Sequence, residues 1–430
     1  MALVKEEIIK KWKDLLEDNS QGVIDGAERM AVTAQLLENT EKMIASGESG
    51  VLTEAAPATN TGGISNYDPV LISLIRRAAP KLIAYDILGV QPMTGPTGQV
   101  FAMRSKYVNQ SGAEAFYNEA NTGFSGITGG NTSILGDASL NVGTAPSGNT
   151  QAYNFGGAMS LVQAEALGTS GNAAFAEMSF SIENFAITAG SRALKAEYTH
   201  EMAQDLKAIH GMEAEKELSD ILSTELISDI NREIVRSVYI CAVEGAQTGT
   251  TTAGVYDLDT DSNGRWMGEK FAGLHFFLET EAHVIAKQTR RGRGNIIITS
   301  SNVASALRMA GTLKFNEAAN KLNIDDTGVT FAGTLSGGTK VYIDPYAAAD
   351  FCVIGYKGAN ALDAGMFYCP YTPLQKVRAV DSDAFTPKIG YKTRYAMAAN
   401  PFSKGSAVSN GALEANSNVY YRRVNISNII

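Results

Sequence analysis

AEKELSDILSTELISDINREIVRSVYICA, at Ala214–Ala242, carries the clearest helical pattern in the chain. Its apolar residues recur at steps of three and four, while charged residues occupy the other faces. The apolar set is Leu218, Ile221, Leu222, Leu226, Ile230, Ile234, Val235 and Val238. At about 1.5 Å per residue this helix would be about 40 Å long, longer than an ordinary globular helix. We therefore expect this helix to be a long structural support for the fold, and we call it the spine helix.

Helical and strand-like segments follow this helix without regular alternation. They are helix Trp266–Ala286, strand Gly294–Thr299, helix Ser301–Met309, strand Thr339–Ile343, strand Cys352–Tyr356, strand Tyr391–Ala399 and strand Asn418–Val424. A doubly wound sheet would instead alternate strand and helix, so the pattern predicts an α+β fold.

Before the spine, two strands are predicted at Val100–Tyr107 and Met178–Thr188, and we expect them to be the two sides of a long hairpin. The sequence between them, about 109–176, is rich in Gly, Ser, Thr and Asn, with scattered aromatic residues. It is interpreted as an inserted, loop-rich β module, and a partly disordered linker is the alternative. A further helical stretch, Tyr67–Leu88, is interrupted at Pro80.

The first fifty-four residues contain every place where Leu or Ile stands two residues before Glu: Leu15–Glu17, Leu36–Glu38 and Leu52–Glu54. After Glu54 the sequence changes to small residues at Ala55–Gly63, which a protease could reach easily. This clustering indicates a removable leader. Chance is the alternative, because Leu and Glu are both common helix formers.

The leader has the pattern of two amphipathic helices separated near Gly26. Such a short pair has little core of its own. We expect it to bind a partner, either another copy of the chain or an internal scaffold.

Composition narrows the class of protein. A chain of 430 residues and 45.7 kDa, 44% hydrophobic, is long enough for two or three domains. Its three cysteines lack the close spacing of a disulfide framework or zinc site and fit a reducing compartment. The sequence contains no apolar run of about twenty residues, so we expect a soluble chain without a secretion signal. A net charge of −9 argues against a protein whose main function is to bind nucleic acid, because binding to phosphates requires an excess of basic residues.

Two segments look like ligand-binding loops but depart from the required pattern. In Gly333–Lys340 a threonine separates the last glycine from the lysine, which misplaces a phosphate cradle, so a hairpin turn is predicted. Asp259–Gly264 matches the first half of a calcium loop, but Lys270 stands where a bidentate carboxylate belongs. A looser calcium site at Asp259–Asn263 and an ordinary polar turn both stay open.

His275, Glu279 and His283 would share one face of a helix and could present metal ligands. Packing beside neighbouring phenylalanines is the simpler interpretation, and no catalytic triad pattern occurs in the sequence. A calcium- or zinc-dependent hydrolase is therefore kept only as a remote alternative, and no cofactor is predicted.

The one dense basic patch comprises Arg290, Arg291 and Arg293. These residues could contact phosphates. In an acidic protein we favour contacts with carboxylates of a neighbouring subunit.

Five segments together resemble the major capsid proteins of T-even-type tailed phages, in matching order from about Asp68 to the C-terminus. They are Arg76–Asp86 (RRAAPKLIAYD), Gly89–Phe101 (GVQPMTGPTGQVF), Arg192–Tyr198 (RALKAEY), Val341–Asp344 (VYID) and Gly390–Tyr395 (GYKTRY). This resemblance implies the tailed-phage capsid fold, with a long spine helix, an extended β hairpin (E-loop), peripheral and axial domains, and a Gly-rich domain inserted in the hairpin.

The resemblance also implies a division of the chain. It comprises a cleaved leader (1–54), an N-terminal arm (55–89), the extended hairpin (90–188, with the insertion at about 109–176), a peripheral domain (189–243 and 374–430) and an axial domain (244–373). In the family a prohead protease cuts after Glu in the hydrophobic-x-Glu context. The expected maturation cut is therefore Glu54–Ala55, with secondary cuts after Glu17 and Glu38.

The function implied by the resemblance is structural and not enzymatic. Copies would assemble as hexameric capsomers into an icosahedral or prolate phage head enclosing double-stranded DNA. Expected partners are the vertex protein, prohead protease, internal scaffold, portal, decoration proteins and a folding chaperonin, with packaged DNA held without sequence specificity and no membrane. The expected location is the virion, and the host cytoplasm during assembly. A paralogous pentameric vertex protein would share nearly all these motifs and is the alternative.

Overall fold

The computed structural model describes residues 2–16, 24, 26–45, 82–116, 124–125, 159, 161–169, 174–262, 264, 266–311, 313–314, 330–360, 362–381, 386–405 and 409–429. These residues form two compact units. The first, here called the body, comprises Met1–Val100 and Phe185–Ile430, and the second, the hairpin unit, comprises Phe101–Asn184.

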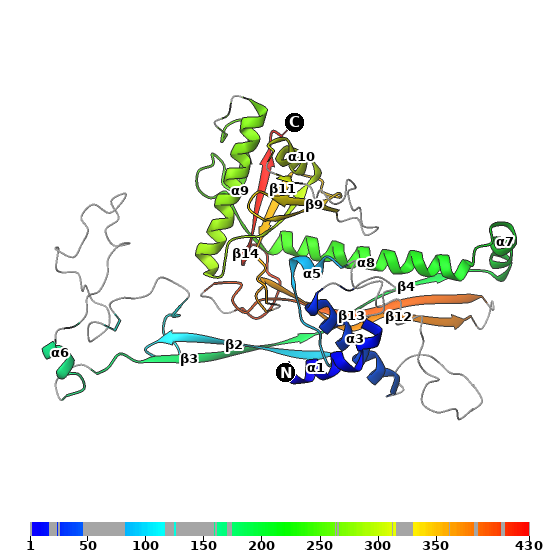
Figure 1. The fold of residues 1–430 in the computed structure, drawn as a ribbon, viewed down its shortest axis with the longest axis horizontal. Coiled ribbons are helices and arrows are strands. Elements are labelled where there is room, and N and C mark those ends of the chain that lie inside the picture. The colour runs from blue at the N-terminus through cyan, green and yellow to red at the C-terminus, as the bar shows by residue number, and fades with distance from the viewer. Residues whose placement is uncertain are drawn as a thin grey trace. The chain divides into compact units, whose positions relative to one another are not determined.

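The helices and strands are intermixed along the chain, as an α+β fold requires (Figure 1). The helices are α1 (Ala2–Lys11), α2 (Lys13–Leu16), α3 (Ala27–Ala45), α5 (Ala84–Ile87), α6 (Leu161–Glu165), α7 (His200–His210), α8 (Ala214–Cys241), α9 (Met267–Thr289) and α10 (Ser301–Met309). The strands are β1 (Gly89–Val90), β2 (Thr97–Tyr107), β3 (Met178–Thr188), β4 (Gly190–Glu197), β5 (Ala242–Glu244), β6 (Val255–Asp257), β7 (Ile296–Ser300), β8 (Leu313–Lys314), β9 (Thr330–Leu335), β10 (Lys340–Asp344), β11 (Phe351–Gly355), β12 (Met366–Val380), β13 (Pro387–Ala399) and β14 (Asn418–Ser427).

The body contains two mixed sheets. The four-stranded sheet has the order β1-β12-β13-β4, and its long strands β12 and β13 are antiparallel. The eight-stranded sheet has the order β5-β14-β11-β7-β10-β9-β8, with β6 paired to β14. In this sheet β7 and β11 are buried at every position, as expected of central strands covered on both faces.

The spine helix α8 packs against residues of both sheets. It spans Ala214–Cys241, which confirms the predicted helix, and Figure 1 shows it as one continuous rod with α7 at its far end. Leu222 and Leu226 pack with β13 residues such as Tyr391. Ile234 and Val238, farther along the same stripe, are fully buried in the main core that includes the eight-stranded sheet.

Helix α9 covers the eight-stranded sheet with Phe271, Leu274, Leu278, Ala282 and Ile285, which are buried at helical spacing. It ends three residues beyond the predicted boundary, because Arg290 adopts a left-handed conformation (φ 56°) and closes the last turn. None of the described helices combines the length and apolar character needed to cross a bilayer.

In the hairpin unit, β2 and β3 form a two-stranded sheet. Strand β3 has the predicted bounds, and β2 begins three residues earlier than predicted. Most of the predicted inserted module and all of the 55–81 segment lie outside the described residues.

Candidate functional site

The predicted cleavage positions are only partly covered by the structure. Glu54, Ala55 and Glu17 lie outside the described residues. Glu38 lies in the middle of α3, and its carboxylate accepts from Lys11 Nζ at 2.9 Å. This hydrogen bond is the main reason that the pKa of Glu38 lies below its usual range. A cut after Glu38 would require α3 to open locally, because a protease binds an extended chain.

The leader helices belong to the body, and they pack against each other and against the rest of it. A small cluster buries Trp12, Leu16, Ile24, Ala34 and Leu37 between them. The opposite face of α3 buries Val32 and Leu36 in the main core of the body. The described apolar faces of the leader pair are thus covered within this chain, by their own small cluster and by the main core. Binding of the leader to another copy or to an internal scaffold stays a prediction.

The predicted basic patch lies at the turn after α9. Arg293 donates from Nη1 to Glu279 Oε1 at 3.2 Å and from Nη2 to the Gly337 carbonyl. Arg291 Nε lies 3.9 Å from Asp363 Oδ1, with half its side chain exposed. Arg290 is exposed at the end of the helix. The carboxylates found beside Arg291 and Arg293 belong to the same chain, and contact with a neighbouring subunit stays a prediction.

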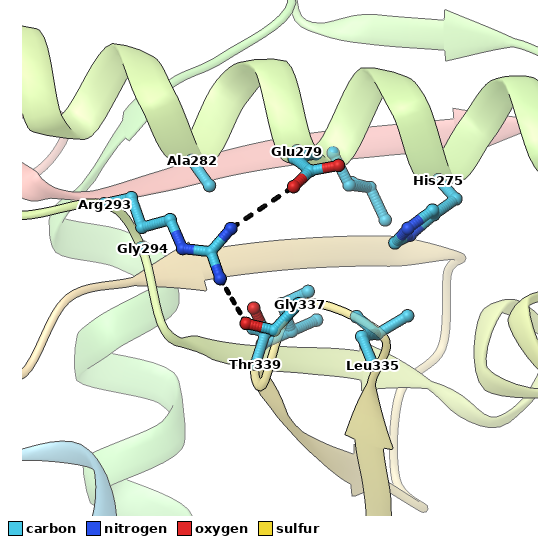
Figure 2. Close-up of a pocket in the computed structure, with 10 residues that line it drawn as sticks. His275, Glu279, Ala282, Arg293, Gly294, Leu335, Gly337 and Thr339 are labelled. Atoms are coloured by element: carbon cyan, nitrogen blue, oxygen red, sulfur yellow. Dashed lines mark hydrogen bonds and ion pairs between the residues drawn. The ribbon is translucent and has the colours of Figure 1, made fainter. Parts of the chain in front are cut away.

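Three segments that were separate candidate sites in the sequence line one pocket (Figure 2). Helix α9 supplies His275 and Glu279, the turn after it supplies Arg293, and the β9–β10 hairpin supplies Gly337 and Thr339. The hairpin prediction is confirmed, since Leu335 N donates to Thr339 O at 2.9 Å. The cavity measures about 20 Å³, which is room for one water molecule. It is too small for a phosphate or a nucleotide.

The metal-ligand predictions do not converge on a described cluster. In the calcium-like turn, Lys270 itself pairs with Asp259, and Asp261 accepts from Thr251 N at 2.8 Å. On α9, the Glu279 carboxylate accepts a hydrogen bond from Arg293. Across the part of the chain that the structure describes, no three His, Cys, Asp or Glu side chains are grouped to hold a metal ion.

The hairpin unit has two contrasting sheet faces. One face exposes five large apolar side chains, each more than half exposed: Phe101, Met103, Met178, Phe180 and Ile182. The other carries Arg104, whose fully buried side chain donates to Glu114 Oε2 at 2.7 Å and to Glu183 Oε2 at 3.0 Å. This ion cluster was not predicted from the sequence. Its only signal is a charge of each sign at inward positions of the two predicted strands.

Comparison with known proteins decides the family. A family model described as the major capsid protein Gp23 matches residues 64–426. The chain belongs to the Gp23 major capsid protein family. The major capsid protein of Serratia phage KSP90 is 39% identical to it over 450 residues, covering 99% of both proteins. The capsid of Myoviridae phage XM1 aligns with a TM-score of 0.42 at 10% identity, over 80% of this chain and 91% of that chain.

Similarity to vertex proteins is less extensive. The capsid vertex protein of Enterobacteria phage T4 is 29% identical over 248 residues, which is 54% of this chain and 56% of that protein. This Gp23-family chain is therefore a major capsid protein of T4-like phages and a component of the virion, in a structural family and not an enzyme class. The family predicted from the five matching segments is confirmed.

Proposed function

We propose that the chain assembles as hexameric capsomers into a phage head that encloses double-stranded DNA. The observation that carries this proposal is the exposed apolar face of the hairpin unit. Five large apolar side chains on one two-stranded sheet are costly to leave in water, and such patches are typical of protein–protein contacts. In a symmetric shell the same contact is repeated at every copy, so a modest interface is multiplied.

The leader, residues 1–54, is in this proposal removed by a prohead protease that cuts between Glu54 and Ala55, with secondary cuts after Glu17 and Glu38. Two observations support a separable leader: every position where Leu or Ile stands two residues before Glu falls within it, and the family model begins only at residue 64. The leader carries eleven acidic and six basic residues, a net charge of −5 of the total −9. Its removal would lower the negative charge of the shell as DNA enters.

The remaining divisions follow the family arrangement: an N-terminal arm (55–89), the extended hairpin (90–188), a peripheral domain (189–243 and 374–430) and an axial domain (244–373). Assembly would take place in the host cytoplasm with the vertex protein, internal scaffold, portal, decoration proteins and a folding chaperonin. The acidic balance fits DNA that is enclosed without sequence-specific contacts.

Replacing Glu54 with Gln tests the processing step. In particles assembled with the protease, mass spectrometry of the Glu54→Gln chain should find no product beginning at Ala55. Glu48→Gln is the matched control, because it changes a nearby leader glutamate that lacks the hydrophobic residue two positions earlier. It should be processed normally. A normal Ala55 terminus in the Glu54 variant would refute the assigned cut.

A further inference from the structure

One face of leader helix α3 is directed at the body. Arg29, Val32, Leu36 and Asn39 are spaced by three, four and three residues, which places them on a single stripe. Val32 and Leu36 are buried in the main core, and Asn39 is 3% exposed. From Arg29 to Asn39 the stripe runs for about 15 Å along the helix axis. The helix is thus attached to the body by a polar contact at each end and apolar contacts between them.

The Arg29 end attaches to α5 and, through it, to the eight-stranded sheet. Arg29 Nη2 donates to Asp86 Oδ1 at 3.1 Å, and its guanidinium lies 5.4 Å from the Tyr85 ring centroid. Helix α5 is tied to this sheet by the Tyr421 hydroxyl, which donates to the Ile87 carbonyl at 3.3 Å. Lys357, which follows β11, donates to the Tyr85 carbonyl.

Two charged residues at the start of α3, Glu28 and Arg29, affect the pKa values of groups in this same region. Burial lowers the pKa of Lys357, and the carboxylate of Glu28 on α3 partly offsets that lowering. Burial raises the pKa of Tyr342 on β10, and the guanidinium of Arg29 partly offsets that rise. Both groups belong to the eight-stranded side of the body, so the beginning of α3 lies against that side.

The Asn39 end attaches to the four-stranded sheet. Asn39 Nδ2 donates to the Met93 carbonyl at 2.7 Å and to the Tyr371 carbonyl, on β12, at 3.1 Å. Gln35 Nε2 donates to Asn39 Oδ1 at 3.1 Å, which orients the amide so that its NH₂ faces both carbonyls. Met93 is itself tied to this sheet, because its N–H donates to the Pro370 carbonyl at 2.9 Å.

A short connector joins these two attachment points within the body. The chain leaves α5 at Ile87, becomes extended at Leu88, and enters the four-stranded sheet as β1. Helix α3 contacts residues on both sides of this connector, Asp86 before it and Met93 after it. A rigid helix fixed on both sides of a bend restrains the bend.

We propose that α3 is an intramolecular splint, which fixes the two sheets of the body relative to each other until the leader is released. The inference rests on the proposed removal of the leader, which would take the splint away and free the connector at 87–90 to bend. Release would also leave the Met93 and Tyr371 carbonyls without the Asn39 amide, and Asp86 without Arg29. The regulated event is thus a change in sheet orientation within one subunit.

The test uses the full chain carrying Glu54→Gln, so that the leader stays attached in every sample. Asn39→Asp replaces an amide donor by a carboxylate of the same shape facing two carbonyl oxygens. Amide hydrogen exchange should become about tenfold faster, or more, at both 83–93 and 366–374. Spin labels at Ala348→Cys, after the eight-stranded sheet's β10, and Lys392→Cys, in the four-stranded sheet, should show a broadened or shifted distance distribution.

Arg29→Gln releases the other end and should change the label distance in the same way, which keeps the test informative if the Asn39 variant folds poorly. Lys42→Gln is the control, because Lys42 pairs with Glu38 within α3 itself. Its exchange and label distance should match those of the parent chain. If Asn39→Asp and Arg29→Gln both leave the label distance unchanged, the splint is refuted, and the proposed cleavage is untouched. Processing of the Glu54 variant would refute the cleavage site and leave the splint result standing.

Discussion

Arg422 on β14 donates from Nε to Glu281 Oε2 on α9, with only 6% and 4% of the two side chains exposed. The second oxygen, Glu281 Oε1, accepts from the Ala246 N–H at 3.1 Å. One carboxylate thus joins a helix, a strand of the eight-stranded sheet and the loop after β5. Removing one partner of a buried ion pair leaves an uncompensated charge in a medium of low dielectric.

Glu281→Gln should therefore lower the free energy of unfolding by about 3–5 kcal/mol, measured by urea denaturation of the full chain. Glu279→Gln is a matched control, since it is the same substitution on the same helix at an exposed pair with Arg293. Its cost should be about 0–1 kcal/mol. Equal losses in the two variants would show that the buried pair has no special role.

Arg104 should hold the hairpin unit together. In Arg104→Met the carboxylates of Glu114 and Glu183, 6% and 18% exposed, lose their shared cation and repel each other. Amide exchange of peptides within 101–116 and 178–184 should accelerate about tenfold or more, because the buried cation that links β2 to Glu114 and to β3 is gone. Lys106→Met changes a half-buried cation two positions along the same strand and should have little effect. Similar acceleration in both variants would argue against the Arg104 cluster.

The buried thiols should make stability fall at high pH. Burial raises the pKa of Cys241 to about 11 and that of Cys369 to about 12. An unfolded thiol ionises near about 8.5, so the folded form keeps its proton at a pH where the unfolded form loses it. The free energy of unfolding is therefore unaffected by these thiols below pH about 8.5. It falls as the pH rises toward 11 and 12, by at most about 1.4 kcal/mol per pH unit for each thiol, because only the unfolded form ionises.

Urea denaturation between pH 8 and about 10.5 measures this loss. Cys369→Ala should show a shallower decline than the parent chain, because one of the titrating groups is gone. In the native protein at pH 8 the three cysteines, all buried, should not react with a thiol reagent. Rapid native labelling, or a decline that is unchanged in the alanine variant, would contradict the assigned burial effect.

The apolar face of the hairpin unit should be needed for assembly and not for folding. The side chain of Ile182 is 65% exposed, so its own chain buries little of its apolar surface on folding. Ile182→Asp should leave the circular dichroism spectrum unchanged and raise the concentration needed for assembly about tenfold or more. Asn184→Asp adds the same charge two residues along the same strand face without removing an apolar side chain. Equal assembly defects in the two variants would indicate a charge effect instead.

Much of the fold could be predicted because its patterns are local and uninterrupted. The α8 prediction is one residue from the observed end, and α10 has the predicted bounds. In α10 the start is also marked by Ser300, whose side chain accepts from the Val303 N–H. Strand β3 alternates exposed and less exposed residues along most of its length, which is the simplest strand pattern to recognise.

Strand β12 was missed for a physical reason. It contains Pro370, which cannot donate a ladder hydrogen bond, and its register against β13 shifts between Pro370 and Thr372 and again between Thr372 and Gln375. Each shift reverses the alternation of side chains along the strand. The β4 segment, Gly190–Glu197, was missed as well, and it is recognisable as a strand mainly by its pairing with β13.

The docking of the leader could not be predicted either, because its decisive contact joins residues far apart in sequence. Asn39 and Tyr371 are separated by 332 positions, and nothing local to either residue indicates the other. The Arg104 cluster depends in the same way on the pairing of two strands. The family, by contrast, could be predicted from short segments whose order along the chain matches that of known capsid proteins.

Electron microscopy of the full chain expressed with its internal scaffold and prohead protease shows whether the chain builds the hexamers of a shell. We expect closed shells whose capsomers are rings of six copies of this chain, with the chain in the shell beginning at Ala55. Chains that stay monomeric at high concentration, or that form only five-membered rings at the vertices of a shell built from another protein, would contradict this expectation.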